Sequence, residues 1–183
     1  MAKQDSISRF ATKLQRPAKP GEDCSWSFLV IPKIVSDGLP RRGRTTVKGV
    51  INGHHFQATL DPDGQLGHWL KVSEELKKAA RANVGDTIIL EFVPVKEEPE
   101  PEIPLDFEEA LKGAPNAIRV WKDTTTIARL DWIHWIVSAK QSKTRTKRIL
   151  DACELLAAGK RRVCCFDRSG YYSKAFSLPD AAD

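Results

Sequence analysis

The chain has 183 residues, of which 41% are hydrophobic and 29% charged, and its formal net charge is +5. This composition is typical of soluble globular proteins and excludes collagen-like, disulfide-scaffold and wholly disordered chains. The longest uncharged apolar run, around Leu29, is far shorter than the roughly 20 residues that span a bilayer. The first ten residues contain no apolar segment of a secretory signal, so we expect a cytoplasmic protein.

Residues 1–21 are basic and end in RPAKPG, which predicts a flexible arm. In the next segment Trp26, Phe28 and Val30 alternate with less bulky side chains, and this period of two predicts a strand that ends near Pro32. The Asn52-Gly53 dipeptide between two strand-like runs is typical of a type I′ turn. We therefore expect a hairpin of residues 45–51 and 54–60.

Ser73, followed by two glutamates, predicts the start of a helix over residues 73–84, because a serine side chain caps the first turn. Gly85 tolerates a positive φ and Asp86 accepts local N–H groups, which favours a sharp turn into a last strand. One helix among several strands predicts a small closed barrel over residues 22–95. The fold class expected is α+β.

Three prolines and four glutamates in residues 96–104 predict an extended linker, because proline removes backbone donors and like charges repel. Residues 105–166 show helical periodicity, including an almost wholly apolar helix around Trp132 and a later helix that stops at Gly159. We expect a helical unit there. Residues 167–183 are predicted to be a tail.

Two groups of basic side chains are candidate binding surfaces for an anionic ligand or nucleic acid, one in the loop GLPRRGRT and one after the apolar helix. The second group has a structural alternative, in which its charges pair with the acidic linker residues 97–102. The candidate residues are Arg41, Arg42, Arg44, Lys140, Lys143, Arg145, Lys147 and Arg148.

The chain contains no phosphate-loop, nucleophile-elbow or zinc-protease motif, so no catalytic residue is predicted. The histidines and cysteines lack the spacing of a zinc site, and we expect neither a metal nor a cofactor. No role can be predicted for the adjacent Cys164 and Cys165. A pocket between barrel and helices, formed by His68, Trp69, His134 and Trp135, remains an alternative that would make the protein a small-molecule binder or an enzyme.

Residues 24–95 resemble the N-terminal domain of unknown function of the YdeI/OmpD-associated (bacteriocin-protection, OmdA-type) proteins. The matching pieces are the strand ending in Val30-Ile31-Pro32, the Gly43-Arg44 entry, the hairpin VKGVING over 47–53, and the VGD sequence at 84–86. The stretch before Trp26 is longer than the family leads one to expect.

Residues 104–158 resemble the companion helical domain of the same family. The start IPLDFEEAL over 103–111, Trp135-Ile136 with Ala139-Lys140, and TRTKRI over 144–149 carry this resemblance. The resemblance implies a double-split β-barrel of the AbrB-like class, followed by the helical unit. The family name also points to bacteriocin protection or outer-membrane protein association, with stress defence through a protein partner, and it offers no catalytic residues that could be transferred. An anionic ligand or nucleic acid is the partner that the two basic groups suggest. The resemblance does not indicate the oligomeric state.

Overall fold

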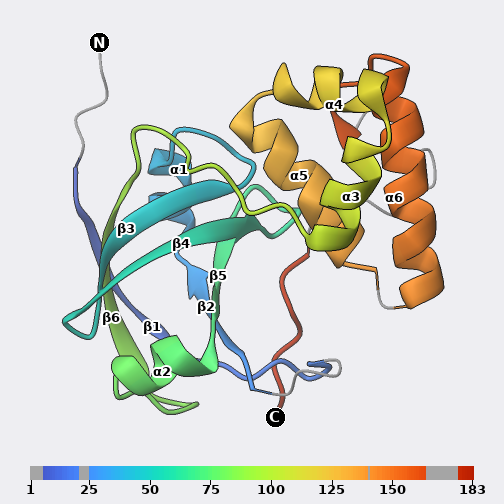
Figure 1. Cartoon of the computed structure of the whole chain (residues 1–183). Coiled ribbons are helices and arrows are strands. Elements are labelled where there is room, and N and C mark those ends of the chain that lie inside the picture. The colour runs from blue at the N-terminus through green and yellow to red at the C-terminus, as the bar shows by residue number, and fades with distance from the viewer. Residues whose placement is uncertain (1–5, 21–24, 140, 164–176) are drawn as a thin grey trace. The chain divides into compact units, whose positions relative to one another are not determined.

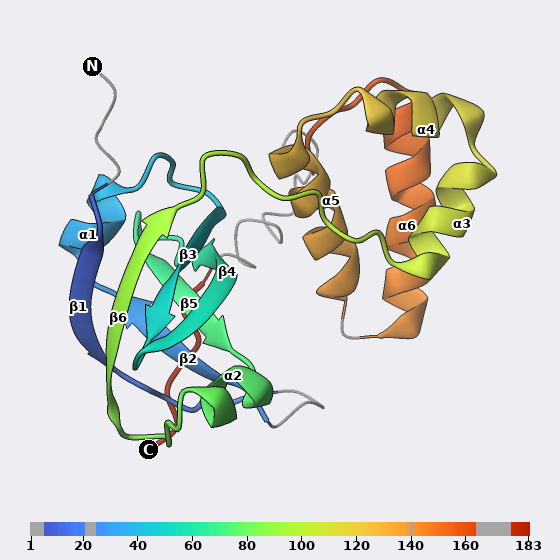
Figure 2. The ribbon, with the colours of Figure 1, turned by 60° about the vertical axis from the view of Figure 1, so that its left-hand side comes forward.

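The computed structural model describes residues 6–20, 25–139, 141–163 and 177–183. The chain divides into two compact units. The barrel unit comprises residues 1–97 and 176–183, and the helical unit comprises residues 98–175. The division between residues 97 and 98 falls in the predicted linker. Figures 1 and 2 show the strands gathered in the barrel unit and the longer helices in the other.

The strands of the barrel unit form one sheet in the order β1-β6-β3-β4-β5-β2, with every neighbouring pair antiparallel. Its described residues form β1 (Ser8–Lys13), β2 (Ser27–Ile31), β3 (Thr45–Ile51), β4 (His54–Pro62), β5 (His68–Val72) and β6 (Thr87–Pro94). An isolated bridge between Gln15 and Phe28 brings the two outer strands together. The sheet is therefore a nearly closed antiparallel barrel.

The predicted hairpin is confirmed. Ile51 pairs with His54 across the turn, and Asn52 and Gly53 have φ angles of 46° and 81°. The side chain of Asn52 also accepts a hydrogen bond from the Ile89 N–H at 3.0 Å. A type I′ turn needs positive φ at both central residues, and asparagine followed by glycine supplies them at low cost.

The barrel unit contains two short helices, α1 (Lys33–Gly38) and α2 (Glu74–Ala79). As predicted, Ser73 caps α2, since its hydroxyl accepts from the Leu76 N–H at 3.2 Å. The helix α1 is not predicted from the sequence pattern. It begins directly after Pro32, whose carbonyl accepts from the N–H groups of Val35 and Ser36.

Two segments predicted to be irregular make backbone pairs in the barrel unit. Residues 8–13, expected as part of a flexible arm, form β1, and Phe10 packs edge-on against Phe92 with ring centroids 5.8 Å apart. Residues 177–183, expected as a tail, return to residues 16–18. The Ala18 N–H donates to the Asp180 carbonyl, and the Ala182 N–H donates to the Arg16 carbonyl.

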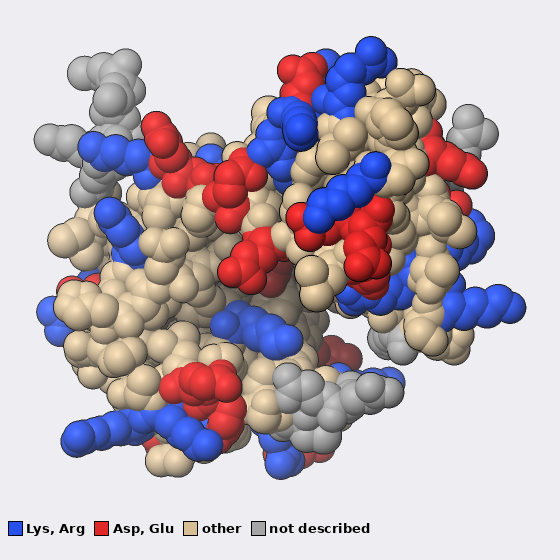
Figure 3. Space-filling view, viewed as in Figure 1, with Lys and Arg blue, Asp and Glu red and all other residues tan. Residues whose placement is uncertain are grey.

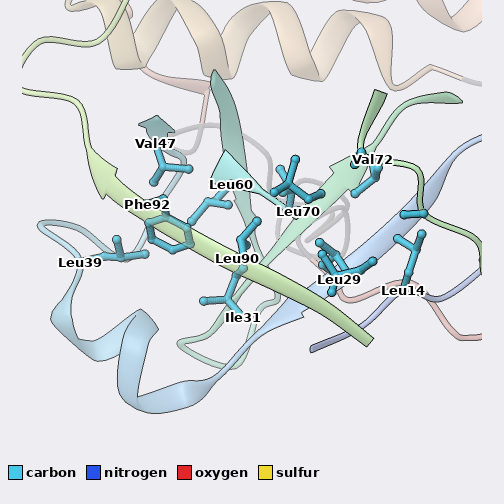
Figure 4. Close-up of a cluster of buried hydrophobic side chains, with 14 residues drawn as sticks. Leu14, Leu29, Ile31, Leu39, Val47, Leu60, Leu70, Val72, Leu90 and Phe92 are labelled. Carbon is cyan, nitrogen blue, oxygen red and sulfur yellow. The ribbon is translucent and has the colours of Figure 1, made fainter. Parts of the chain in front are cut away.

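The barrel encloses a hydrophobic core to which every strand except β1 contributes a fully or almost fully buried residue, while Phe10 of β1 packs against its side. Figure 4 shows labelled side chains such as Leu29, Leu60 and Leu90 meeting inside the sheet. Burial of such side chains stabilises a fold by about 1.5–3 kcal/mol each. This core holds in place the strand ends and loops around it.

The helical unit consists of α3 (Leu105–Lys112), α4 (Pro115–Lys122), α5 (Thr126–Val137) and α6 (Ser142–Ala157) among its described residues. Its interior includes Phe107, Trp121, Trp132 and Leu156, all buried. The α+β class, a small barrel followed by a helical unit, is confirmed. No helix in the described part of the chain is both long and apolar enough to cross a membrane.

Gly49 of β3 lies where β6 approaches most closely. A Cβ atom at this position would be 1.9 Å from the Glu91 carbonyl oxygen. We expect Gly49→Ala to lower the free energy of unfolding by about 2 kcal/mol or more, since the strands must move apart. Urea unfolding measures the effect. Gly38→Ala is the control, because its Cβ would meet nothing within 4 Å, and equal losses in the two variants would contradict the prediction.

Candidate functional site: a cationic pocket in the barrel unit

A pocket of about 540 Å³ opens in the barrel unit between α1, the start of β1 and the end of β6. Figure 2 shows these three segments beside one another. The chain brings them together because β1 pairs with β6 in an antiparallel register that sets Ser8 opposite Phe92. The pocket is lined by Ser6, Ser8, Arg9, Ile34, Val35, Gly38, Leu39, Pro40, Arg41, Pro94, Val95 and Lys96.

Three cationic side chains, Arg9, Arg41 and Lys96, line this pocket together with the serines at positions 6 and 8. None of the described lining residues is acidic. The Arg9 side chain is 68% exposed, and its Nε lies 3.4 Å from a carboxylate oxygen of Glu91 on β6. Guanidinium and ammonium groups suit carboxylate or phosphate oxygens. The pocket is therefore the candidate functional site.

Arg41 is the only one of the eight predicted cations among the described lining residues of this pocket. The turn after α1 positions it. Leu39 is buried, and its N–H donates to the Ser36 carbonyl at 3.2 Å, which ends the helix. Leu39 has an extended backbone, with φ −69° and ψ 154°, as expected for a residue before proline, and Arg41 follows Pro40 in the loop.

Of the other two arginines of the predicted loop site, Arg42 is exposed and Arg44 is buried. Arg42 donates to an Asp37 carboxylate oxygen at 2.6 Å and to the Leu66 carbonyl at 3.3 Å. Arg44 is only 4% exposed, and its Nε donates to Asp61 at 2.9 Å. Arg44 stands directly before β3, where the chain enters the barrel wall, and this explains its burial.

The pocket candidates His68 and Trp69 lie on β5, outside the cationic pocket. His68 is fully buried, and its Nε2 donates to the Gly43 carbonyl at 3.1 Å. Burial lowers the pKa of His68 because it disfavours the imidazolium form. Trp69 packs against Trp26 and Phe28, with ring centroids 6.2 Å away in both cases.

The other two pocket candidates, His134 and Trp135, lie half-buried on α5. The Trp135 ring packs against Trp132 at 6.0 Å between centroids, and the guanidinium of Arg148 lies 5.4 Å from its centroid. These two candidates belong to the helical unit, whereas His68 and Trp69 belong to the barrel unit.

The basic group of the helical unit is largely engaged in local contacts. Arg145 donates to both carboxylate oxygens of Asp106, at 2.7 and 3.1 Å, and this contact holds the pKa of that carboxyl below its ordinary value. Lys147 lies 2.6 Å from Asp151. Arg148 is 8% exposed and donates to the Trp135 carbonyl and the Ser138 hydroxyl.

Lys143 is exposed on α6, and Lys140 lies outside the described residues. In the acidic linker, Glu100 pairs with Arg129 of α5. Figure 3 shows Lys and Arg side chains interspersed with Asp and Glu side chains on the visible faces of both units.

The described residues contain one cysteine, Cys153. Within residues 6–20, 25–139, 141–163 and 177–183, no group of three or more His, Cys, Asp or Glu side chains is placed to hold a metal ion. Cys153 on α6 is a half-buried free thiol, and burial raises its pKa. Cys164 and Cys165, for which the sequence predicts no role, lie outside the described part of the chain.

Sequence reasoning missed Arg9 and Lys96 as site residues. Arg9 stands in the segment predicted as an arm, and Lys96 opens the predicted linker. The available signal is the alternation in SRFATK, in which Phe10 and Thr12 share one face and Arg9 lies on the other. That pattern could identify β1, but it does not indicate that β6 is its partner.

The buried Arg44–Asp61 pair allows a test of stability. We expect Asp61→Ala to lower the free energy of unfolding by about 3 kcal/mol, because it leaves a charge in the barrel wall without its carboxylate. Asp37→Ala removes an exposed partner of Arg42 and should cost less than about 1 kcal/mol. Chemical denaturation of both variants measures this difference, and similar losses would argue against it.

His68 predicts a dependence of stability on pH. Its pKa is lowered in the folded protein from the ordinary value of 6.5. As the pH falls below about 6.5, the unfolded chain binds a proton that the folded chain resists, so stability decreases. The His68→Gln variant, which keeps a donor for Gly43, should lose less stability between pH 7.5 and pH 5.5 than the parent protein. Urea unfolding at both pH values tests this, and an unchanged pH dependence in the variant would refute it.

Two protein families match the chain, one on each unit. Residues 10–91 match DUF1905, a domain of unknown function, and residues 100–159 match OmdA, described as bacteriocin-protection, YdeI or OmpD-associated. No curated protein matches the chain. The two matches lie on either side of the division at residues 97 and 98, in the order expected from the sequence motifs. The chain therefore carries a DUF1905 match on its barrel unit, followed by a match to the YdeI/OmpD-associated OmdA family on its helical unit.

Proposed function

We propose that this protein is a non-catalytic binding protein whose barrel unit holds a small anionic ligand in the cationic pocket. The observation that carries the proposal is the shared lining of Arg9, Arg41 and Lys96 around one space of about 540 Å³. Cationic groups stabilise an anion by charge-assisted hydrogen bonds, and these three residues bring positive charge to the pocket. Arg41, a residue of the predicted loop site, lies within the DUF1905 match, whereas Arg9 and Lys96 lie just outside its two ends.

A small ligand fits these observations better than nucleic acid. Binding to a nucleic acid backbone draws on many cationic side chains along an extended surface. On α6, Arg145 and Lys147 are paired with aspartates, and Arg148 is buried. These contacts weaken the case for a phosphate-binding surface on the helical unit. The pocket instead gathers its cations around a confined volume.

The family description refers to bacteriocin protection. We include in the proposal that anion binding contributes to such protection. Either binding of the anion is itself the protective step, or the bound anion helps the protein to bind a protein partner. The pocket and the helical unit would then have separate tasks, ligand binding for the DUF1905 unit and partner contact for the OmdA unit.

Calorimetric titration with inorganic phosphate at low ionic strength tests the proposal. We expect binding to the parent protein and a loss of about tenfold or more in affinity for Arg41→Gln, because charged hydrogen bonds contribute about 1.5–3 kcal/mol. Lys143→Gln on α6 is the matched control and should bind phosphate like the parent. Absence of binding to the parent, or an equal loss in the two variants, would reject the pocket as the site.

A further inference from the structure

The lining of the cationic pocket is divided into a charged part and an apolar part. Besides the three cations, it contains Ile34 and Val35 of α1, Leu39, and the segment Pro94-Val95 at the end of β6. An inorganic anion would use the charged part alone. The apolar part therefore bears on which class of ligand the pocket takes.

Ile34 is the most unusual of these apolar residues, because its side chain is 83% exposed. Its neighbour Val35 packs against the barrel core, so α1 is anchored on one side and presents Ile34 on another. A single exposed isoleucine is common on protein surfaces. Here, however, it lines the same pocket as Arg9, Arg41 and Lys96, so apolar and cationic contacts are available to one ligand.

The volume of the pocket supports a ligand larger than a simple ion. A water molecule takes about 30 Å³ of the liquid, and a phosphate ion is only a few times larger. The pocket measures about 540 Å³. An oxyanion bound by the three cations would leave most of this space free for another part of the ligand. The lining residues other than the cations are mainly apolar.

The geometry points to an amphipathic anion as the ligand: a phosphate or carboxylate head held by Arg9, Arg41 and Lys96, with an apolar body against Ile34 and Val35. This inference rests on the proposed anion-binding function and adds the second half of the ligand. The head supplies orientation through directional hydrogen bonds, and the body supplies affinity by covering apolar surface that otherwise contacts water.

Calorimetric titration of the parent protein with hexyl phosphate, inorganic phosphate and hexanol tests the inference. Burial of each methylene group strengthens binding by about fourfold, so hexyl phosphate should bind more than about tenfold tighter than inorganic phosphate. Hexanol, which lacks the charged head, should bind more weakly than either anion.

Two isoleucine variants test where the chain of the ligand lies. Ile34→Ser should bind inorganic phosphate normally but lose most of the advantage of hexyl phosphate. Ile89→Ser is the matched control, since Ile89 is also exposed, at 45%, and is not among the described lining residues. The Ile89→Ser variant should still bind hexyl phosphate more tightly than inorganic phosphate, by the same factor as the parent protein. Circular dichroism of both variants confirms that they are folded.

The results separate this inference from the proposed function. Equal affinities for inorganic and hexyl phosphate would overturn the amphipathic ligand while leaving anion binding intact. Binding of hexanol as tight as that of hexyl phosphate would overturn both, and an unchanged advantage in Ile34→Ser would overturn the placement of the chain. Competition by phosphatidylglycerol vesicles would identify a lipid as the source of the anion, and its absence would identify a free small molecule.

Discussion

The barrel depends on the backbone of Leu14 and Gln15, which links the two outer strands of the sheet. The Leu14 N–H donates to the Asp86 carbonyl at 2.9 Å, and its carbonyl accepts from the Gly85 N–H at 2.8 Å. Gln15 exchanges two backbone hydrogen bonds with Phe28. Unpaired strand edges expose polar groups that must find partners. This short link supplies partners on both sides and allows the strands to surround one core, in which Leu14 is itself fully buried.

The same pairing explains why the cationic pocket could not be predicted from local sequence patterns. Arg9 and Lys96 stand near opposite ends of the barrel unit's main segment, and only the β1–β6 pairing brings them to one opening. Arg41, Arg42 and Arg44 show the converse, because close neighbours in sequence are separated by their environments: one lines the pocket, one pairs with an exposed aspartate and one is buried. The sequence identifies the cationic side chains, but the pairing of strands that are distant in sequence determines which of these side chains share a surface.

Features with local causes could be predicted. The Asn52-Gly53 turn, the Ser73 cap and the positive φ of Gly85 each follow from the conformational preferences of one or two residues. Pro115, in the predicted helical unit, is a less specific signal, because proline occurs both at the first turn of a helix and after its end. In the structure it stands at the first turn of α4, where the missing N–H costs nothing. A proline at a helix boundary is thus compatible with either the start or the end of a helix.

The return of residues 177–183 to residues 16–18 gives the chain an unusual connectivity. The helical unit is joined to the barrel unit by the peptide chain at residues 97 and 98, and the chain that leaves it ends in backbone pairs on the barrel unit. While those pairs hold, an unfolded helical unit is a closed loop with fewer conformations than a free chain, and such closure disfavours unfolding. The pairs with Arg16 and Ala18 therefore act as a noncovalent clasp, which couples the folding of the OmdA unit to the integrity of the DUF1905 barrel.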